Sequence, residues 1–285
     1  MAKVTLRFYA ELNDFLPAGR RRRDLTLTCS AQSPVRHLIE GCGVPHTEVE
    51  LIVRGGESIG LESQVADGDR IAIYPMFEAF DVRPVLRLRA RPLRHPRFLA
   101  DAHLGALARG LRMLGFDTIW HNDLGDAVLV DQAAAEGRIL LTRDRRLLMR
   151  QGVTHGCYLR QGSTGAQLGE LVQRLQLCAE IAPFTRCLVC NEGIVPVTAE
   201  AVPDLVPPAV LARHDELWRC PGCNRIYWKG SHWAAMHRRI ADLCAPTLGC
   251  AAETAAGGAT ARPQGHLVTD QGPRGCRERV TNRDA

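Results

Sequence analysis

Apolar and polar residues alternate along several short segments in the first part of the chain, which is the pattern of half-buried strands. The segment between the first two strands is rich in Arg and Gly and predicts a hairpin. A short helix is expected next, with Ser33 as its cap and Pro34 at its first position. The expected elements are strands at residues 3–10, 25–29, 50–53 and 70–74 and a helix at residues 33–40. This order predicts an α+β roll of the ubiquitin-like kind over residues 1–81.

The middle of the chain changes to a helical period. Leu104, Leu107, Leu111 and Leu114 recur at spacings of three, four and three, which places them on one face of a helix that Gly115 ends. Strands are expected at residues 97–100, 117–120, 138–142 and 155–159, and helices at residues 101–114, 126–136, 145–151 and 166–177. Alternating strands and helices predict an α/β domain with a parallel sheet over residues 97–182.

The composition is that of a globular chain. Hydrophobic residues make up 46% and charged residues 24% of the 285 residues, which excludes fibrous and wholly disordered classes. No run approaches the roughly 18 consecutive apolar residues of a membrane helix, so we expect no membrane association. The start, MAKVTLRFYAEL, contains no apolar signal core, and we therefore expect a cytoplasmic protein.

The net charge of +5 is concentrated in one short segment. Residues 82–100 hold six arginines and no acid, and three prolines predict an interdomain linker over residues 82–96. These arginines, like the run at residues 20–23, are either solvated or in contact with RNA phosphates. Residues 245–285 are rich in Ala and Gly without an apolar period, so we expect a disordered tail.

Four of the eleven cysteines form two CxxC pairs, Cys187 with Cys190 and Cys220 with Cys223. In a reducing compartment this spacing favours a metal over disulfides. Four thiolates close a tetrahedral zinc site, and such a site is structural. We therefore expect a zinc ribbon over residues 183–244, with a loop at residues 202–210 between the two pairs. The other cysteines are expected to be buried, inert thiols or tail residues: Cys29, Cys42, Cys157, Cys178, Cys244, Cys250 and Cys276.

Aromatic and basic residues follow the second cysteine pair. Trp228, Lys229 and His232 belong to a strand and to the start of a helix that Ser231 would cap. Such residues stack on bases and hold phosphates of single-stranded nucleic acid. The alternative is that the aromatic side chains pack the ribbon against the preceding domain.

Acidic residues follow the strands of the expected parallel sheet. Asp101 and Asp144 come just after apolar strands and Asp126 opens a helix, so all three reach the carboxyl edge of the sheet. Carboxylates brought together repel one another unless a cation neutralises them, and oxygen ligands suit Mg²⁺ or Mn²⁺. Such ions assist phosphodiester cleavage. Each aspartate on its own is equally an ordinary helix or turn cap.

Polar neighbours of these acids have two interpretations. His103 is either a helix surface residue or a ligand, and Asp123 is either a turn former or a further acid. Arg143 and Arg145 flank Asp144, where they either meet a phosphate or are solvated.

The closing segment of the first domain, DGDRIAIYP, resembles that of the small sulfur-carrier relatives of ubiquitin. Those carriers end in a free Gly-Gly whose carboxylate is charged with sulfur. Here the chain continues, and Gly55-Gly56 lies in mid-chain, where it predicts a hairpin turn. A sulfur-carrier role is therefore the least favoured hypothesis.

Longer motifs resemble the PIN-like RNase domain of the Mut-seven C-terminal RNase family. They are FLADAHLGALARGLRMLGFDT, ND..GDAVLVDQAAAEGRILLTRDRRLL and the YWKGSH that follows the zinc cysteines. The resemblance covers residues 1 to about 244, and some members carry the same ubiquitin-like front. It implies a metal-dependent ribonuclease in which Asp101, Asp126 and Asp144 are the catalytic acids, and Asp123 is the nearest candidate for a fourth.

Two functions of different class follow. The first is a ribonuclease that binds Mg²⁺ or Mn²⁺ through these acids and cleaves single-stranded RNA, with His103, Arg143, Arg145, Trp228, Lys229 and His232 as candidate substrate contacts. The second is a non-catalytic RNA-binding or adaptor protein in which the carboxylates are structural. The sequence identifies no protein partner for the ubiquitin-like domain.

Overall fold

The computed structural model describes residues 1–75, 96–202 and 205–244, and Met1–Ala245 form one compact unit. The predicted tail and all but the last residue of the predicted linker lie outside the described residues. Within the described part, no helix is long and apolar enough to span a bilayer.

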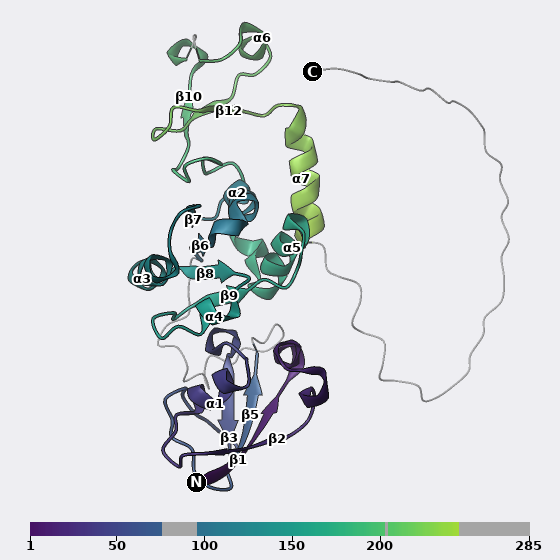
Figure 1. Cartoon of the computed structure of the whole chain (residues 1–285). Coiled ribbons are helices and arrows are strands. Elements are labelled where there is room, and N and C mark those ends of the chain that lie inside the picture. Colours follow the sequence, from purple (N-terminus) through teal and green to yellow (C-terminus); the bar gives the residue numbers. More distant parts are fainter. Residues whose placement is uncertain (76–95, 203–204, 245–285) are drawn as a thin grey trace, which may run out of the picture. The chain divides into compact units, whose positions relative to one another are not determined.

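The first domain is a five-stranded sheet packed on one helix (Figure 1), with the four strands that the alternating pattern predicted and a further short strand at Glu57–Ser58. The strand order is β2-β1-β5-β3-β4, with β1 and β5 parallel and the other neighbours antiparallel. Val4, Leu6 and Phe8 of β1 are buried with the apolar side of the helix in one core. The elements are β1 (Ala2–Phe8), β2 (Leu25–Cys29), α1 (Val35–Gly41), β3 (Leu51–Arg54), β4 (Glu57–Ser58) and β5 (Arg70–Tyr74).

Two turns of this domain test the sequence analysis. Gly55 and Gly56 join β3 to β4 with φ values of +59° and +88°, a left-handed conformation that favours glycine, so the predicted hairpin turn is confirmed. The predicted cap of α1 is wrong: Pro34 occupies the cap position, and no side chain caps the helix. The reason is tertiary, because Pro34 forms a bridge with Gln64 and the Ser33 carbonyl accepts from Val65 N at 3.1 Å.

The second domain, called the parallel-sheet domain below, has four parallel strands in the order β7-β6-β8-β9. Successive side chains of β6 and β8 enter different cores: Phe98 and Leu141 pack with α2 and α5, whereas Leu99 and Leu140 pack with α3 and α4. Burial on both faces explains why these strands are apolar throughout. The elements are β6 (Phe98–Ala100), α2 (Gly105–Met113), β7 (Thr118–Trp120), α3 (Asp126–Glu136), β8 (Ile139–Thr142), α4 (Arg145–Leu148), β9 (Gly156–Tyr158) and α5 (Thr164–Arg174).

Helix ends in this domain follow local signals. Gly137 directly follows α3 and Gly115 lies two residues after α2, with positive φ values of 61° and 96°, so the prediction that these glycines end the two helices is confirmed. Helix α5 starts at Thr164, two residues before the predicted start. The Ser163 hydroxyl accepts from Ala166 N at 3.4 Å and caps the helix there.

The cysteine region folds as a three-stranded antiparallel sheet, β10 (Val195–Val197), β11 (Leu217–Arg219) and β12 (Ile226–Trp228). The predicted loop at residues 202–210 is partly wrong, because α6 (Pro208–Leu211) starts there with proline in its first turn. Val202, Val206 and Leu217 form a small core beneath this segment.

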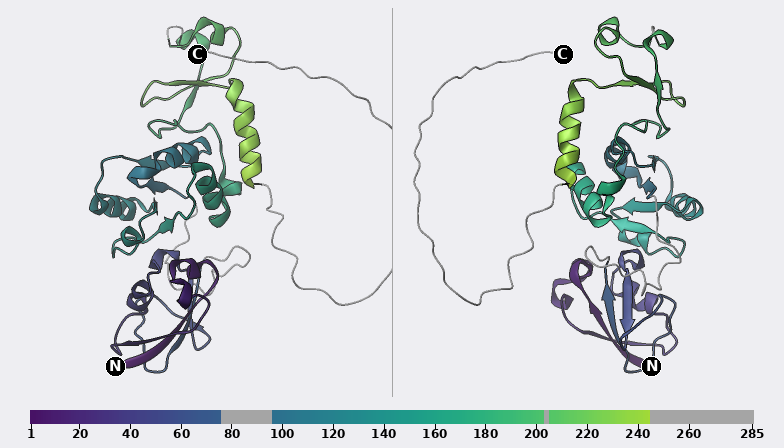
Figure 2. Two further views of the ribbon diagram at one scale, coloured as in Figure 1. Left: turned by 45° about the vertical axis from the view of Figure 1, so that its right-hand side comes forward. Right: turned by 180° about the vertical axis from the view of Figure 1, so that it is seen from behind.

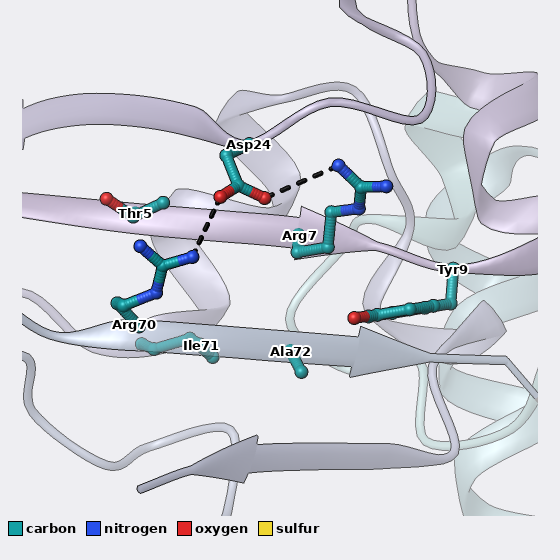
Figure 3. Close-up of a pocket in the computed structure, with 7 residues that line it drawn as sticks. All are labelled: Thr5, Arg7, Tyr9, Asp24, Arg70, Ile71 and Ala72. Carbon is teal, nitrogen blue, oxygen red and sulfur yellow. Dashed lines mark hydrogen bonds and ion pairs between the residues drawn. The ribbon is translucent and has the colours of Figure 1, made fainter.

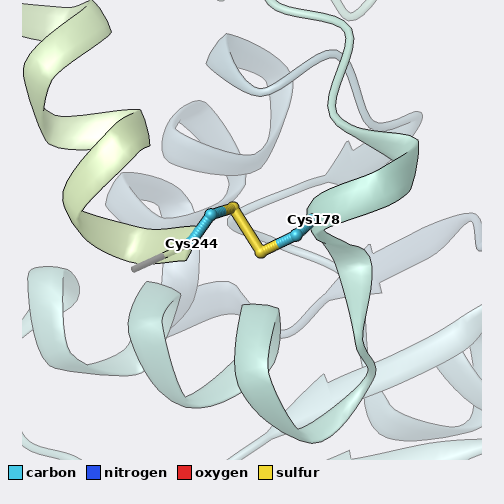
Figure 4. Close-up of a disulfide and its surroundings, with 2 residues drawn as sticks. All are labelled: Cys178 and Cys244. Atoms are coloured by element: carbon cyan, nitrogen blue, oxygen red, sulfur yellow. A yellow bond between two sulfur atoms is a disulfide. The ribbon is translucent and has the colours of Figure 1, made fainter. Parts of the chain in front are cut away.

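The last helix, α7 (Ser231–Cys244), returns to the parallel-sheet domain and runs beside α5 (Figures 1 and 2). Ile240 and Leu243 pack against the α2–α5 core. Cys178 and Cys244 form a disulfide at this contact (Figure 4), which corrects the expectation of free thiols at both positions. Sequence spacing could not show the pair, because 66 residues separate the two cysteines.

A buried carboxylate connects the first domain to the parallel-sheet domain. Glu48, in a 3-10 turn at His46–Glu48, has a side chain only 1% exposed. Its Oε1 accepts from Tyr158 N at 2.6 Å, and its Oε2 accepts from Arg174 Nη2 at 2.7 Å and from Arg160 Nη2 at 3.3 Å. Glu170 pairs with the same two guanidinium groups, so two carboxylates and two arginines neutralise one another in this contact.

We expect Glu48→Gln to lower the free energy of unfolding by about 3 kcal/mol, because it removes one of the two buried carboxylates that neutralise Arg160 and Arg174. Urea unfolding followed by circular dichroism would measure the change. The matched control is Glu57→Gln on the exposed β3–β4 hairpin, which should stay within about 0.5 kcal/mol of the wild type. Equal stability of the two variants would contradict this account of Glu48.

Candidate active site and metal centre

The carboxyl ends of three neighbouring strands bring together most of the predicted acids. Asp101 directly follows β6, Asp144 lies two residues beyond β8, and Asp123 lies three residues beyond β7. Because β7, β6 and β8 are adjacent and parallel, these loops share one edge of the sheet. The topology therefore places the acids where the sequence analysis expected them.

A hydroxyl group joins two of the acids. Thr142 Oγ1, at the end of β8, donates to Asp101 Oδ2 at 2.6 Å and accepts from Asp144 N at 2.9 Å. Thr142 is fully buried, whereas Asp101 is partly exposed and Asp144 is exposed. Sequence reasoning missed this residue, because the pairing of Ala100 with Leu141, which sets Asp101 opposite Thr142, is established only in the folded sheet.

The capping interpretation of Asp101 and Asp144 holds in the structure. Asp101 Oδ1 accepts from Ala102 N at 2.6 Å, and Asp144 Oδ1 accepts from Arg146 N at 2.8 Å, so each caps the turn that follows. Each carboxylate has a second oxygen, and Oδ2 of Asp101 is the one that faces Thr142. Capping therefore orients these carboxylates without using all of their oxygen atoms.

Asp126 is not the cap of α3, because the helix starts at Asp126 and Gly125 occupies the cap position. Its Oδ2 instead accepts from Arg150 Nη2 at 2.8 Å, in an ion pair about half exposed on both sides. Among the described residues, the four cysteines are the group of three or more ligand atoms that lie close enough to hold a metal. The aspartates thus share an edge without forming a closed cluster.

The predicted substrate contacts around these acids differ in their surroundings. His103 and Arg143 are exposed. Arg145 is not: its guanidinium lies 5.0 Å from the Phe15 ring and 5.3 Å from the Tyr158 ring, and it donates to Phe15 O at 3.2 Å. Arg145 therefore belongs to the contact with the first domain.

Trp120 supports the backbone after Asp101. Its Nε1 donates to Ala102 O at 2.9 Å, and a Cβ at Gly105 would lie 2.7 Å from its ring. Glycine at the start of α2 is thus required for the indole to reach the turn that carries Asp101.

The four cysteines form the second candidate site. Cys187, Cys190, Cys220 and Cys223 have their Sγ atoms within 4.8 Å of one another. A tetrahedral thiolate site with bonds of about 2.3 Å has Sγ–Sγ separations of about 3.8 Å, so this donor set fits a metal such as zinc. Burial opposes ionisation of Cys187, but hydrogen bonds from Cys190 N and from the Tyr227 hydroxyl lower the pKa of its thiol to about 6.

The first cysteine turn is bound firmly to the parallel-sheet domain. Asn191 Oδ1 accepts from Thr118 N at 2.9 Å, and its Nδ2 donates to Asp117 Oδ1 at 2.7 Å. Burial raises the pKa of Asp117, but hydrogen bonds from Arg138 and Asn191 outweigh it and hold the pKa below its usual value. Arg112 Nη1 donates to Val189 O at 2.7 Å. Sequence reasoning missed these contacts, because they join distant segments.

The predicted nucleic-acid contacts of the ribbon are only partly free. Trp228 is 37% exposed. Lys229 pairs with Glu216, and its ammonium lies 5.5 Å from the rings of both Trp218 and Trp233. The side chain of His232 lies outside the described residues.

A family model described as the Mut7-C RNAse domain matches residues 96–240, and one described as Mut7-C ubiquitin matches residues 1–81. The chain belongs to the Mut7-C RNase domain family. The predicted family and its ubiquitin-like front are confirmed. RNA is the general substrate class that the name of this RNase domain implies.

Three solved structures resemble the first part of this Mut7-C protein. Two are small archaeal modifier protein 1 from Haloferax volcanii, with 20% and 18% identity over 26% and 28% of this chain and 98% and 100% of theirs, at TM-scores of 0.22 and 0.23. The third is a putative molybdopterin converting factor, subunit 1, from Pyrococcus furiosus, with 18% identity over 26% of this chain and 98% of its own, at a TM-score of 0.22. These TM-scores are too low to support a conclusion about function. No curated protein gives a significant match.

We expect Thr142→Val to lower the free energy of unfolding by about 1–2 kcal/mol, because Asp144 N loses its acceptor and Asp101 loses a donor. Thr142→Ser keeps the hydroxyl and should retain most of that stability. Urea unfolding of the three proteins would measure the difference. A Val variant as stable as the Ser variant would show that the hydroxyl is not needed.

Removal of the metal from the cysteine site should lower the thermal midpoint, because four thiols without an ion no longer close the two turns. We expect elemental analysis to find one zinc per chain and calorimetry to show a lower midpoint after treatment with a chelator. Cys220→Ser should lose the zinc, whereas Cys29→Ser, outside this site, should retain it. Full zinc content in Cys220→Ser would contradict the assignment.

Proposed function

We propose that this Mut7-C protein is a metal-dependent ribonuclease that hydrolyses phosphodiester bonds of single-stranded RNA at the carboxyl edge of the parallel sheet. The observation that supports the proposal is the Thr142 hydroxyl, which links Asp101 to Asp144 within a domain of an RNase family.

Mg²⁺ or Mn²⁺ fits the donors present, because carboxylate oxygens are the ligands that these ions prefer. Asp101 and Asp144 would hold the ion, with Asp126 and Asp123 as further ligands. To bind the ion, Asp126 would have to release its ion pair with Arg150. The loss of free energy would be small, because this ion pair is about half exposed. When bound, such an ion lowers the pKa of a water molecule and stabilises charge on the leaving oxygen.

The protein's own side chains would orient the acids and the RNA. Thr142 fixes the direction of the Asp101 carboxylate through its 2.6 Å hydrogen bond. Arg143 is exposed beside Asp144, where its guanidinium can bind a phosphate in a bidentate manner. His103 is exposed two residues beyond Asp101 and is a second candidate contact. Arg145 acts instead as a positioning residue, because Phe15 and Tyr158 hold it beside the first domain.

The cysteine site completes the proposal. Zn²⁺ would be structural there, because four thiolates leave no open position for a substrate. The ribbon would contribute RNA contacts through Trp228 and Lys229, and through His232. We place this activity in the cytoplasm, in line with the sequence analysis.

The decisive test is cleavage of a labelled single-stranded RNA in Mn²⁺. We expect Asp144→Asn and Asp101→Asn to lower the rate by about 100-fold or more, because each loses a proposed metal ligand. The matched control is Asp131→Asn on the exposed side of α3, which should keep the wild-type rate. All proteins would be prepared with zinc retained, and their circular dichroism compared.

Three other results would reject or change the proposal. Equal rates in all variants would indicate a contaminant or another site. Cleavage that requires neither Mg²⁺ nor Mn²⁺ would reject the proposed role of the metal ion. RNA binding without cleavage by the wild type would favour the non-catalytic adaptor.

A further inference from the structure

A cavity of about 450 Å³ lies where α2, both cysteine turns and β12 meet. Leu188 and Val189 of the first cysteine turn, Arg225 of the second, Tyr227 of β12 and Arg109 of α2 contribute to its walls. Ligand pockets commonly measure about 300–1,000 Å³, so the cavity is large enough for a small ligand.

The residues that line this cavity contribute two positive charges and no negative charge. Arg109 and Arg225 are both exposed, and the residues that line the cavity include no carboxylate. Within the described part of the chain, neither arginine forms an ion pair. A pocket on the sheet of the first domain provides a contrast, because Asp24 there lies between Arg7 and Arg70 and pairs with both (Figure 3). The cavity between α2 and the cysteine turns is therefore the stronger candidate for binding an anionic ligand.

One wall of the cavity is apolar and fixed in position. The Tyr227 hydroxyl lies 3.1 Å from Cys187 Sγ and accepts from Leu188 N at 3.2 Å, which fixes the direction of the ring. Val189 also lines the cavity and is 50% exposed. An aromatic ring and an exposed aliphatic side chain suit a flat, apolar ligand group such as a nucleobase.

We propose that this cavity binds one nucleotide of single-stranded RNA, with the base against Tyr227 and Val189 and its flanking phosphates on Arg109 and Arg225. This inference rests on the proposed function, since it assigns a contact of the same substrate. Guanidinium groups match phosphate in geometry and stack on bases. An acidic peptide would satisfy the arginines but not the flat apolar wall.

The position of Arg109 connects the cavity to the acids. Arg109 lies in the second turn of α2, whose first residue, Gly105, is four residues beyond Asp101. An RNA strand held in the cavity would extend along the first turns of α2 to reach the sheet edge. Both cysteine turns form walls, so nucleotide binding also requires the metal that closes them.

Binding of a fluorescein-labelled single-stranded 12-mer tests the proposal by anisotropy. All proteins in this comparison carry Asp144→Asn, so that the RNA is not cleaved during the measurement. The comparison of affinities is therefore valid whether or not the wild type is a nuclease. We expect Arg109→Gln/Arg225→Gln to weaken binding about tenfold and to reduce the salt slope by about 1.4, since each single-strand phosphate contact contributes about 0.7. The matched control is Arg213→Gln/Arg238→Gln, two exposed arginines outside the cavity, which should bind nearly as the parent does.

A second matched pair of variants tests the apolar wall of the cavity. Val189→Asp places a charge in the cavity and should weaken RNA binding at least tenfold, whereas Val195→Asp should not, since Val195 is 47% exposed on β10 outside the cavity. Equal affinities within either matched set would overturn the proposal. So would equally strong competition by an abasic ribose-phosphate oligomer or by polyglutamate, because the cavity would then recognise charge alone.

The two proposals fail in different ways. An inactive wild type in Mn²⁺ rejects the ribonuclease and leaves the binding comparison valid. If the wild type cleaves RNA but the cavity variants bind RNA as tightly as their parent does, only the nucleotide site is rejected.

Discussion

The parallel pairing of β6 with β8 is the constraint on which the candidate site depends. Ala100 lies opposite Leu141, so Asp101 lies opposite Thr142 and Asp144 begins the next turn. A shift of one residue would turn every side chain of β8 to the other face of the sheet. Burial on both faces fixes this register, because Leu140 and Leu141 belong to different cores. The apolar cores thereby set the positions of polar atoms at the sheet edge.

Two further contacts connect the parallel-sheet domain to the rest of the chain through buried or partly buried polar groups. Glu48 meets Arg160 and Arg174 on one side, and Asn191 meets Asp117 on the other. A buried charge or amide tolerates little displacement, because it has already lost its hydrogen bonds to water and would then lose its protein partner as well. Such contacts define orientation more sharply than apolar packing does. They make the ubiquitin-like domain and the cysteine turns parts of one compact unit.

Periodicity and local signals predicted the elements well. The alternation in β2 and β5, the leucine spacing in α2 and the glycines after α2 and α3 are short-range properties, so the sequence displays them directly. The predictions failed where a distant segment decides the outcome. Pro34 replaces Ser33 before α1 because of Gln64, and Cys178 finds Cys244 only after α7 has returned to α5.

The sequence by itself determined the family, the strand and helix order, the four-cysteine metal set and the placement of the acids after their strands. Each of these follows from residue type and spacing along the chain. Only the tertiary structure decided that Thr142 joins Asp101 to Asp144, that Asp126 pairs with Arg150 and that Arg145 faces Phe15. The physical reason is that hydrogen bonds and ion pairs extend only a few ångströms, so their partners are fixed by packing rather than by position in the sequence.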